Sequence, residues 1–180
     1  MLNPLSETTF EAHIAEYLAN SDLYNQRSSA QFDIERLCDA EMLEQFLRAQ
    51  PIVWKKLSQH FAGRETETVI REYNKRLDRG ESVLNIMRKG FTVSGAKVKF
   101  CQFKPTLEGE GTENYRLYRA NRFSVVRQMR YSMGADSGNE LDLCILLNGI
   151  PLFTFELKNE GTGQNYTHGI AQYRTQRNAE

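Results

Sequence analysis

Residues 141–158, LDLCILLNGIPLFTFELK, decide the fold of this chain. Two apolar runs flank the dipeptide Asn148-Gly149, which is the strongest short-range signal for a β-hairpin. The two arms are apolar almost throughout, as expected for a central pair of strands. Charges in such a pair need a reason, because burying them is costly. Three charged side chains interrupt the arms: Asp142, Glu156 and Lys158.

The geometry of the turn decides whether these charges share a face of the hairpin. Glu156 and Lys158 are two residues apart and therefore project from one face of their strand. A strict two-residue loop at Asn148-Gly149 would put Asp142 on the opposite face. A three-residue loop with a bulge would align all three charges. We predict the bulged or longer turn.

Two carboxylates on one face repel each other unless a positive charge lies between them. Oxygen ligands from Asp142 and Glu156, with a backbone carbonyl such as that of Leu157, suit Mg²⁺, which keeps several waters. Lys158 is then placed to polarise a metal-bound water or to stabilise the transition state. The pattern predicts metal-assisted phosphodiester hydrolysis. The alternative is that the charges form a solvated strand face.

The composition is that of an ordinary globular chain. Its 180 residues, 40% of them hydrophobic, suffice for one core, so we predict a single domain over residues 1–180. The 23 basic and 23 acidic residues cancel, so any site for a polyanion must be local. Apolar runs are far shorter than the ~20 residues that span a membrane, and no secretory signal is recognisable, which predicts a cytoplasmic protein. Three widely spaced cysteines indicate reduced, buried thiols.

Helical periodicity dominates the first half of the chain. A helix is expected from near Thr8, where Thr8 and Glu11 are spaced as a capping box. Residues 40–61 are also helical in pattern, but Pro51 favours a break into two helices. Two further helices are expected over residues 64–79 and 82–87.

The pattern changes to strands from about residue 92. Residues 123–131 are rich in β-branched and aromatic side chains, and polar, glycine-containing segments at 108–112 and 134–139 predict loops. A last helix is expected over residues 166–177. We therefore predict an α+β or α/β domain. Its helical layer covers about 1–90, and its sheet, hairpin and closing helix cover about 91–180.

The stretch LDLCILLNGIPLFTFELKN, with GTGQNYTHGIAQYRTQRN after it and NRFSVVRQMRYS before it, resembles the nuclease motif of the PD-(D/E)xK superfamily. More narrowly, it resembles the amino-terminal endonuclease domain of the R subunit of type I restriction-modification enzymes. TTFEAHIAEYL and FLRAQPIVWKKL also fit that subunit, so the resemblance extends over the whole chain. It implies a PD-(D/E)xK restriction-endonuclease-like α/β fold, in which helices flank a mixed central sheet and a helical layer comes first.

The resemblance also implies a function. The chain would be the nuclease module of a type I site-specific deoxyribonuclease, cutting double-stranded DNA with Mg²⁺, with the methyltransferase (M) and specificity (S) subunits as partners and no membrane. ATP-driven translocation would be supplied by motor domains that this chain lacks, so ATP serves only the full-length subunit, and the chain is expected to be a fragment of it. No phosphate-binding loop for a nucleotide is present, and the three histidines share no metal-binding spacing.

Particular residues take roles from the same resemblance. Asp142 and Glu156 would bind the metal, and Lys158 would be the catalytic lysine. Glu11 matches an acidic residue that such nucleases place beside the metal, although it also has the spacing of a capping box. Gln172 matches the glutamine of a QxxxY element whose tyrosine is absent here.

Residues 115–131 contain five arginines and no acid. Arginine pairs with phosphate independently of base sequence, so this run is the candidate for holding the DNA backbone beside the metal. The alternative is a solvated strand face that balances the acidic hairpin. The candidate DNA-binding residues are Arg116, Arg119, Arg122, Arg127, Arg130 and, on the last helix, Arg174.

Two other functions remain open from the sequence. The chain could be a stand-alone PD-(D/E)xK nuclease, such as a repair enzyme. It could also be a catalytically inactive nuclease fold that only docks DNA or a partner subunit. Loss of cleavage on substitution of Asp142 or Lys158, with assembly retained, separates catalysis from docking.

Overall fold

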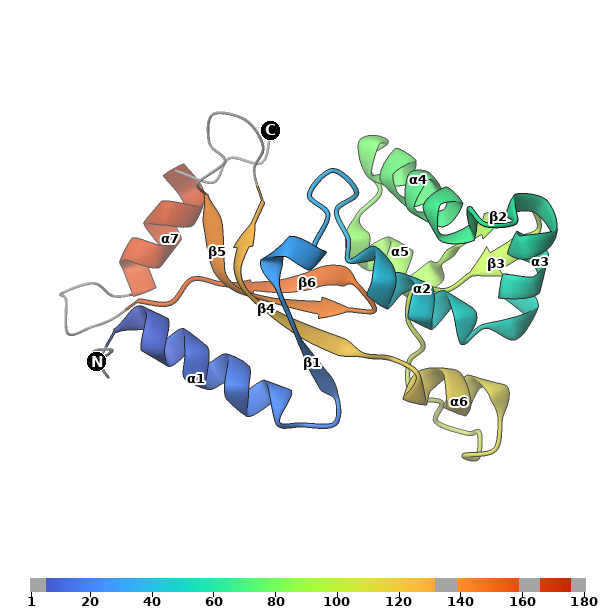
Figure 1. Ribbon diagram of the computed structural model, residues 1–180, viewed down its shortest axis with the longest axis horizontal. Coiled ribbons are helices and arrows are strands. Elements are labelled where there is room, and N and C mark those ends of the chain that lie inside the picture. Colours follow the sequence, from blue (N-terminus) through green and yellow to red (C-terminus); the bar gives the residue numbers. More distant parts are fainter. Residues whose placement is uncertain (1–5, 132–138, 159–165, 176–180) are drawn as a thin grey trace.

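The computed structural model describes residues 6–131, 139–158 and 166–175, without the side chains of residues 172 and 173. Figure 1 shows the arrangement of its elements. In chain order they are α1 (Glu7–Ala19), β1 (Tyr24–Arg27), the 3-10 helix η1 (Ser29–Gln31), α2 (Ala40–Arg48), α3 (Pro51–Phe61), α4 (Glu65–Asp78), α5 (Val83–Lys89), β2 (Phe91–Val93), β3 (Ala96–Val98), α6 (Glu113–Arg119), β4 (Phe123–Arg130), β5 (Glu140–Leu147), β6 (Ile150–Phe155) and α7 (Tyr166–Thr175).

A mixed four-stranded sheet in the order β1-β4-β5-β6 forms the centre of the molecule. β1 runs parallel to β4, and the other neighbours are antiparallel. Ala15 of α1 packs against the sheet with Val125 and Leu143. Helices α1 and α7 lie near the end of the sheet where β5 begins and β6 ends (Figure 1). The predicted α/β class, a mixed sheet flanked by helices, is confirmed.

Helices α2 to α5 and the two-stranded sheet β2-β3 form a second layer around their own apolar core. Leu57, Tyr73 and Phe100 are buried in it. Leu147 and Ile150, at the turn of the β5-β6 hairpin, belong to the same core. The hairpin therefore joins the helical layer to the main sheet.

Most of the predicted helices are confirmed. α2 ends at Arg48 and α3 begins at Pro51, as the proline predicted. α4 and α5 lie where the pattern placed them, and α7 covers the described part of the expected last helix. All three cysteines are buried free thiols, as expected. Residues 134–138 of one predicted loop lie outside the described residues.

Three elements were not predicted: β1, the three-residue 3-10 helix η1 and α6. β1 has the short polar sequence YNQR, and it is a strand because it pairs with β4 rather than because of its own pattern. α6 overlaps the start of the arginine-rich stretch, residues 115–131, for which a strand face was the alternative interpretation. It begins at the N-cap Thr112, whose hydroxyl accepts a hydrogen bond from the Tyr115 N–H.

The capping-box interpretation of Thr8 and Glu11 is wrong. α1 begins one residue before Thr8, and its N-cap is Ser6, whose hydroxyl accepts a hydrogen bond from the Thr9 N–H. Since Glu11 lies five residues after the N-cap, it cannot close a capping box there. Glu11 is instead buried against the sheet.

The turn of the hairpin also differs from our prediction. Asn148 (φ 51°) and Gly149 (φ 85°) form a strict two-residue turn, because both accept the positive φ that a tight hairpin turn requires. The extra residue is Leu152, farther along β6, and the register shifts there, between Ile145 and Leu146 of β5. A bulge is present, but it lies in the strand rather than in the turn.

Candidate active site

The open end of the β5-β6 hairpin brings together the three charged residues of its arms. Beyond the bulge, the register of the strands puts Asp142 opposite Glu156. Asp142 Oδ2 accepts a hydrogen bond of 2.6 Å from the Leu157 N–H. Lys158 Nζ lies 2.9 Å from Glu156 Oε1, and these side chains are only 13% and 5% exposed. The structure therefore aligns the charges as predicted, through a different bulge.

A backbone irregularity in β4 lies opposite Asp142. Gln128 has a φ of 48°, which is rare for a residue with a side chain. Met129 packs in the same apolar cluster as Val126, although residues three apart in a regular strand point to opposite faces. Strain of this kind costs about 1–3 kcal/mol and is concentrated at functional sites.

Glu11 of α1 reaches the same place from the first helix. Its Oε1 accepts a hydrogen bond of 2.8 Å from Arg127 Nε on β4, and its side chain is 5% exposed. Burial raises the pKa of Glu11, the bond to Arg127 opposes this, and the charges of Asp142 and Glu140 raise the pKa further. Ala15, one turn farther along α1, packs against Leu143, so Glu11 lies on the part of α1 that covers β5 next to Asp142.

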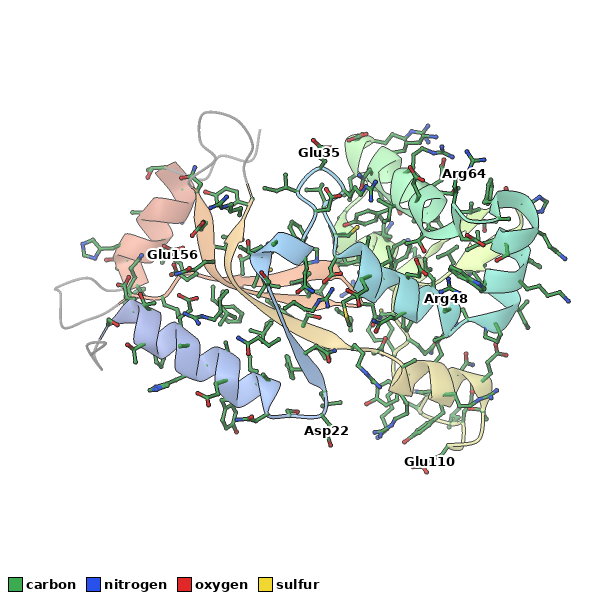
Figure 2. All side chains as sticks on the ribbon, viewed as in Figure 1. Asp22, Glu35, Arg48, Arg64, Glu110 and Glu156 are labelled. Atoms are coloured by element: carbon green, nitrogen blue, oxygen red, sulfur yellow. The ribbon has the colours of Figure 1, made fainter. Side chains whose placement is uncertain are left out.

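The pKa of Asp142 is also raised. Burial is the largest cause, and the nearby Glu156 charge adds to it, whereas the Leu157 N–H and the Lys158 charge lower the pKa. In this structure each carboxylate has a donor of its own. Figure 2 shows Glu156 in the space between α1 and α7.

The donor chemistry of this cluster fits Mg²⁺. Three carboxylates, those of Glu11, Asp142 and Glu156, face two cationic side chains, so a net negative charge remains when all are ionised. Hard oxygen donors with one or two carboxylates and several waters are what Mg²⁺ prefers. Within the described ranges, no three acidic, histidine or cysteine side chains are close enough to hold an ion by themselves. A cation here would therefore rely on main-chain oxygen and water as well.

Helix α7 lies beside Lys158. A Cβ added at Gly169 would be 3.9 Å from Lys158 Cγ, which is an ordinary van der Waals contact. Gln172 lies one turn farther along α7, and its side chain is outside the description. Arg174 is exposed on the same helix.

The arginine run does not form one surface beside the cluster. Helix α6 and the residues that follow it lie at the opposite end of β4 from the open end of the hairpin (Figure 1). The run divides because its first two arginines belong to α6, whereas its last two lie farther along β4. Arg116, Arg119 and Arg122 are exposed at the far end, whereas Arg127 and Arg130 are ion-paired to Glu11 and Glu140.

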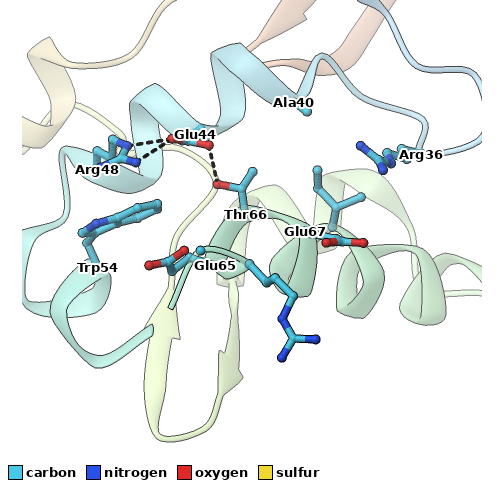
Figure 3. A pocket seen from close by; sticks show the side chains of 11 residues that line it. Arg36, Ala40, Glu44, Arg48, Trp54, Glu65, Thr66 and Glu67 are labelled. Atoms are coloured by element: carbon cyan, nitrogen blue, oxygen red, sulfur yellow. Dashed lines mark hydrogen bonds and ion pairs between the residues drawn. The ribbon is translucent and has the colours of Figure 1, made fainter. Parts of the chain in front are cut away.

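A hollow of about 290 Å³ lies away from the cluster, between α2, α3 and α4 (Figure 3). The Arg48 guanidinium stacks 4.1 Å above the Trp54 ring and pairs with Glu44 at 2.8 Å. Glu44 also accepts a hydrogen bond from Thr66. These polar groups satisfy one another, which indicates a structural role.

Sequence reasoning missed the contact between Glu11 and Arg127. The two residues are 116 positions apart, and no local pattern links them. Their encounter follows from the packing of α1 on β4 and β5. Glu11 and Arg127 carry opposite charges, so their contact could have been predicted if the packing of α1 on the sheet had been known.

Comparison with protein families matches residues 5–180, nearly the whole chain, to the family described as Type I restriction enzyme R protein N terminus. No match was found among curated proteins or among solved structures. None of the described helices is long and apolar enough to cross a membrane.

Proposed function

We propose, from the premise that the chain belongs to the family of type I restriction enzyme R protein N termini, that it is the nuclease module of such an enzyme. Its substrate would be double-stranded DNA, and its cofactor Mg²⁺. The observation that carries the proposal is the meeting of Asp142, Glu156 and Lys158 at the open end of the hairpin. Nearly buried charges of this kind serve function rather than stability.

Each residue of the cluster has a chemical task in this proposal. Asp142 and Glu156, with the main-chain carbonyl of Leu157, would hold the cation, and Glu11 would add negative charge beside them. When bound, Mg²⁺ supplies Lewis-acid stabilisation and an activated water. Lys158, held next to Glu156 in this structure, is placed to orient that water or to stabilise charge that develops on the phosphate.

The module would work within a larger assembly. M and S subunits would supply methylation and sequence recognition, and motor domains of the R subunit would bind ATP and translocate DNA. Arginine side chains would hold the phosphate backbone without reading its sequence. Arg174 is our candidate for such a contact, because it is exposed on α7, the helix that lies beside Lys158 at Gly169.

Substitution of Asp142 in the R subunit, assembled with M and S subunits, tests the proposal. Asp142→Asn keeps an oxygen that can accept the Leu157 hydrogen bond, but it removes the charge. We expect loss of DNA cleavage with ATP hydrolysis unchanged. Asp22→Asn, at an exposed aspartate far from the cluster, is the matched control and should cleave normally.

Two results would contradict the proposal. Cleavage by Asp142→Asn at the normal rate would show that this carboxylate has no catalytic role. Failure of the variant to assemble with M and S subunits, when the control assembles, would favour a docking function instead.

A further inference from the structure

Arg127 on β4 and Glu11 on α1 form a largely buried ion pair beside the acidic cluster. Arg127 Nε donates to Glu11 Oε1 at 2.8 Å. The Glu11 side chain is 5% exposed and that of Arg127 is 31% exposed. A carboxylate so far removed from water is costly unless a fixed positive partner compensates it.

A second ion pair on the same strand gives the contrast. Arg130 Nε lies 3.1 Å from Glu140 Oε1, but these side chains are 67% and 36% exposed. Exposed pairs of this kind contribute little, because water screens them. The two arginines are three residues apart on β4 and make the same type of bond, so burial of the partner is what separates them.

The Arg127–Glu11 pair lies within reach of the proposed metal ligands. Arg127 pairs with Leu143, the neighbour of Asp142 on β5, and Ala15, one turn after Glu11 on α1, packs against the same Leu143. α1 contains no lysine or arginine that could serve Glu11 instead. Arg127 therefore supplies from the sheet the positive charge that the helix lacks.

We propose that Arg127 is a positioning residue of the nuclease site: it holds the Glu11 carboxylate beside Asp142, where Glu11 contributes to cation binding. This inference rests on the proposed function, because it concerns the same cluster. It also gives Arg127 a role other than the DNA contact that the sequence suggested, since its guanidinium is bonded to Glu11. Removing a partner that orients a metal ligand typically weakens metal binding by about 10–100-fold.

The affinity of the full 180-residue chain for Mn²⁺ alone, measured by titration calorimetry, tests the inference. Arg127→Met keeps the aliphatic stem and removes the guanidinium, and we expect its Kd to rise by about 10–100-fold. The matched control is Arg36→Met, which removes an exposed ion pair, with Asp33, outside the cluster. Its Kd should stay within about twofold of the unsubstituted chain.

A second variant keeps the test decisive if Arg127→Met does not fold. Arg127→Lys retains the positive charge but loses the planar fork of donors. We expect about a tenfold rise in its Kd, checked on protein that unfolds cooperatively. Mn²⁺ binding by Arg127→Lys as tight as in the unsubstituted chain would overturn the inference.

DNA binding without divalent cations gives a second readout. If Arg127 is a positioning residue, Arg127→Met binds a short duplex with the same affinity and salt dependence as the unsubstituted chain. If Arg127 contacts a phosphate instead, its loss weakens DNA binding and makes the logarithmic salt dependence shallower by about one unit. That result, together with unchanged Mn²⁺ affinity, would assign Arg127 to DNA and overturn the inference.

Asp142→Asn separates this inference from the proposed function. The proposed function fails if the unsubstituted chain does not bind Mn²⁺, or if Asp142→Asn binds Mn²⁺ as tightly as the unsubstituted chain. The inference then fails with it. If binding depends on Asp142 but not on Arg127, only the inference fails.

Discussion

The two ends of the β5-β6 hairpin are built on opposite principles. At the turn, Asn148 is 1% exposed, and its side chain bonds the main chain of Arg122 and Phe100. The carbonyl of Gly149 accepts a hydrogen bond from the Asp39 N–H at the start of α2. At the open end, carboxylates crowd together and the pKa of Asp142 is raised.

The difference shows that the turn stabilises the fold, whereas the open end destabilises it. The turn is apolar around a few fully satisfied polar groups, and it fixes the helical layer to the sheet. The open end carries more negative than positive charge in a partly desolvated place, which is unfavourable without a further cation. Substitutions at the turn should therefore reduce stability, and substitutions at the open end should reduce activity.

Removal of the Lys158 charge is expected to have the largest effect. Lys158→Met keeps the aliphatic stem, and we expect DNA cleavage by the R, M and S assembly to fall by about a thousandfold, as for loss of a group that stabilises a transition state. Cooperative thermal unfolding should be retained. Lys104→Met, at an exposed lysine, is the control. Cleavage within tenfold of normal would contradict the catalytic role of Lys158.

At the turn, Gly149→Ala should destabilise the fold. An added Cβ would overlap the carbonyl oxygen of Asp39, and the φ of 85° disfavours alanine. We expect a loss of about 2–5 kcal/mol in the free energy of unfolding, measured by denaturant titration. Gly95→Ala has a similar φ of 76° and no neighbour within 4 Å, so it should lose only about 1–2 kcal/mol. Equal losses in the two variants would show that the close approach to α2 is unimportant.

Asn148→Ala should have the next largest effect on stability. It leaves the N–H of Arg122 and the carbonyl of Phe100 without their side-chain partner, which costs about 1–3 kcal/mol for buried groups. Denaturant titration measures the loss. Asn25→Ala, at an exposed position of β1, should change stability by about 0.5 kcal/mol or less. A loss no greater than that of this control would mean that the turn is not the anchor described here.

The smallest effect on stability is expected for Asp142→Asn, which should raise the free energy of unfolding rather than lower it. Burial raises the pKa of Asp142, so the carboxyl favours the folded state at pH below its ordinary value of 3.8, and that contribution is lost as the pH rises through the folded pKa. Asparagine resembles the protonated form. At pH 7 the variant should be more stable by up to about 1 kcal/mol, and the difference should vanish near pH 3. Lower stability at pH 7 would contradict the strain assigned to the open end.

Much of this structure could be predicted from local sequence. The hairpin follows from Asn148-Gly149 between apolar runs, and the break between α2 and α3 follows from Pro51. The meeting of Asp142 with Glu156 was predicted for an incorrect reason. Side chains alternate between the faces of a sheet, so Asp142 and Glu156 share a face only if the hairpin contains one extra residue. The sequence does not say whether that residue lies in the turn or in the strand.

The remaining features depend on contacts between distant segments. β1 is a polar tetrapeptide that becomes a strand beside β4, and Glu11 is buried because α1 packs on the sheet. The arginine run looked continuous because the sequence does not show that its first two arginines lie on α6 and its last two on β4. Periodicity reports the face of one element, but not which elements meet.

The most direct test of the central claim is the anomalous difference map of a crystal of the chain soaked in Mn²⁺. We predict a peak between the carboxylates of Asp142 and Glu156, near the main-chain carbonyl of Leu157, with Lys158 Nζ within hydrogen-bonding distance of a water bound to the ion. A fully soaked crystal with no peak at this end of the hairpin, or with Mn²⁺ only elsewhere, would contradict the claim that these residues form a metal-dependent nuclease site.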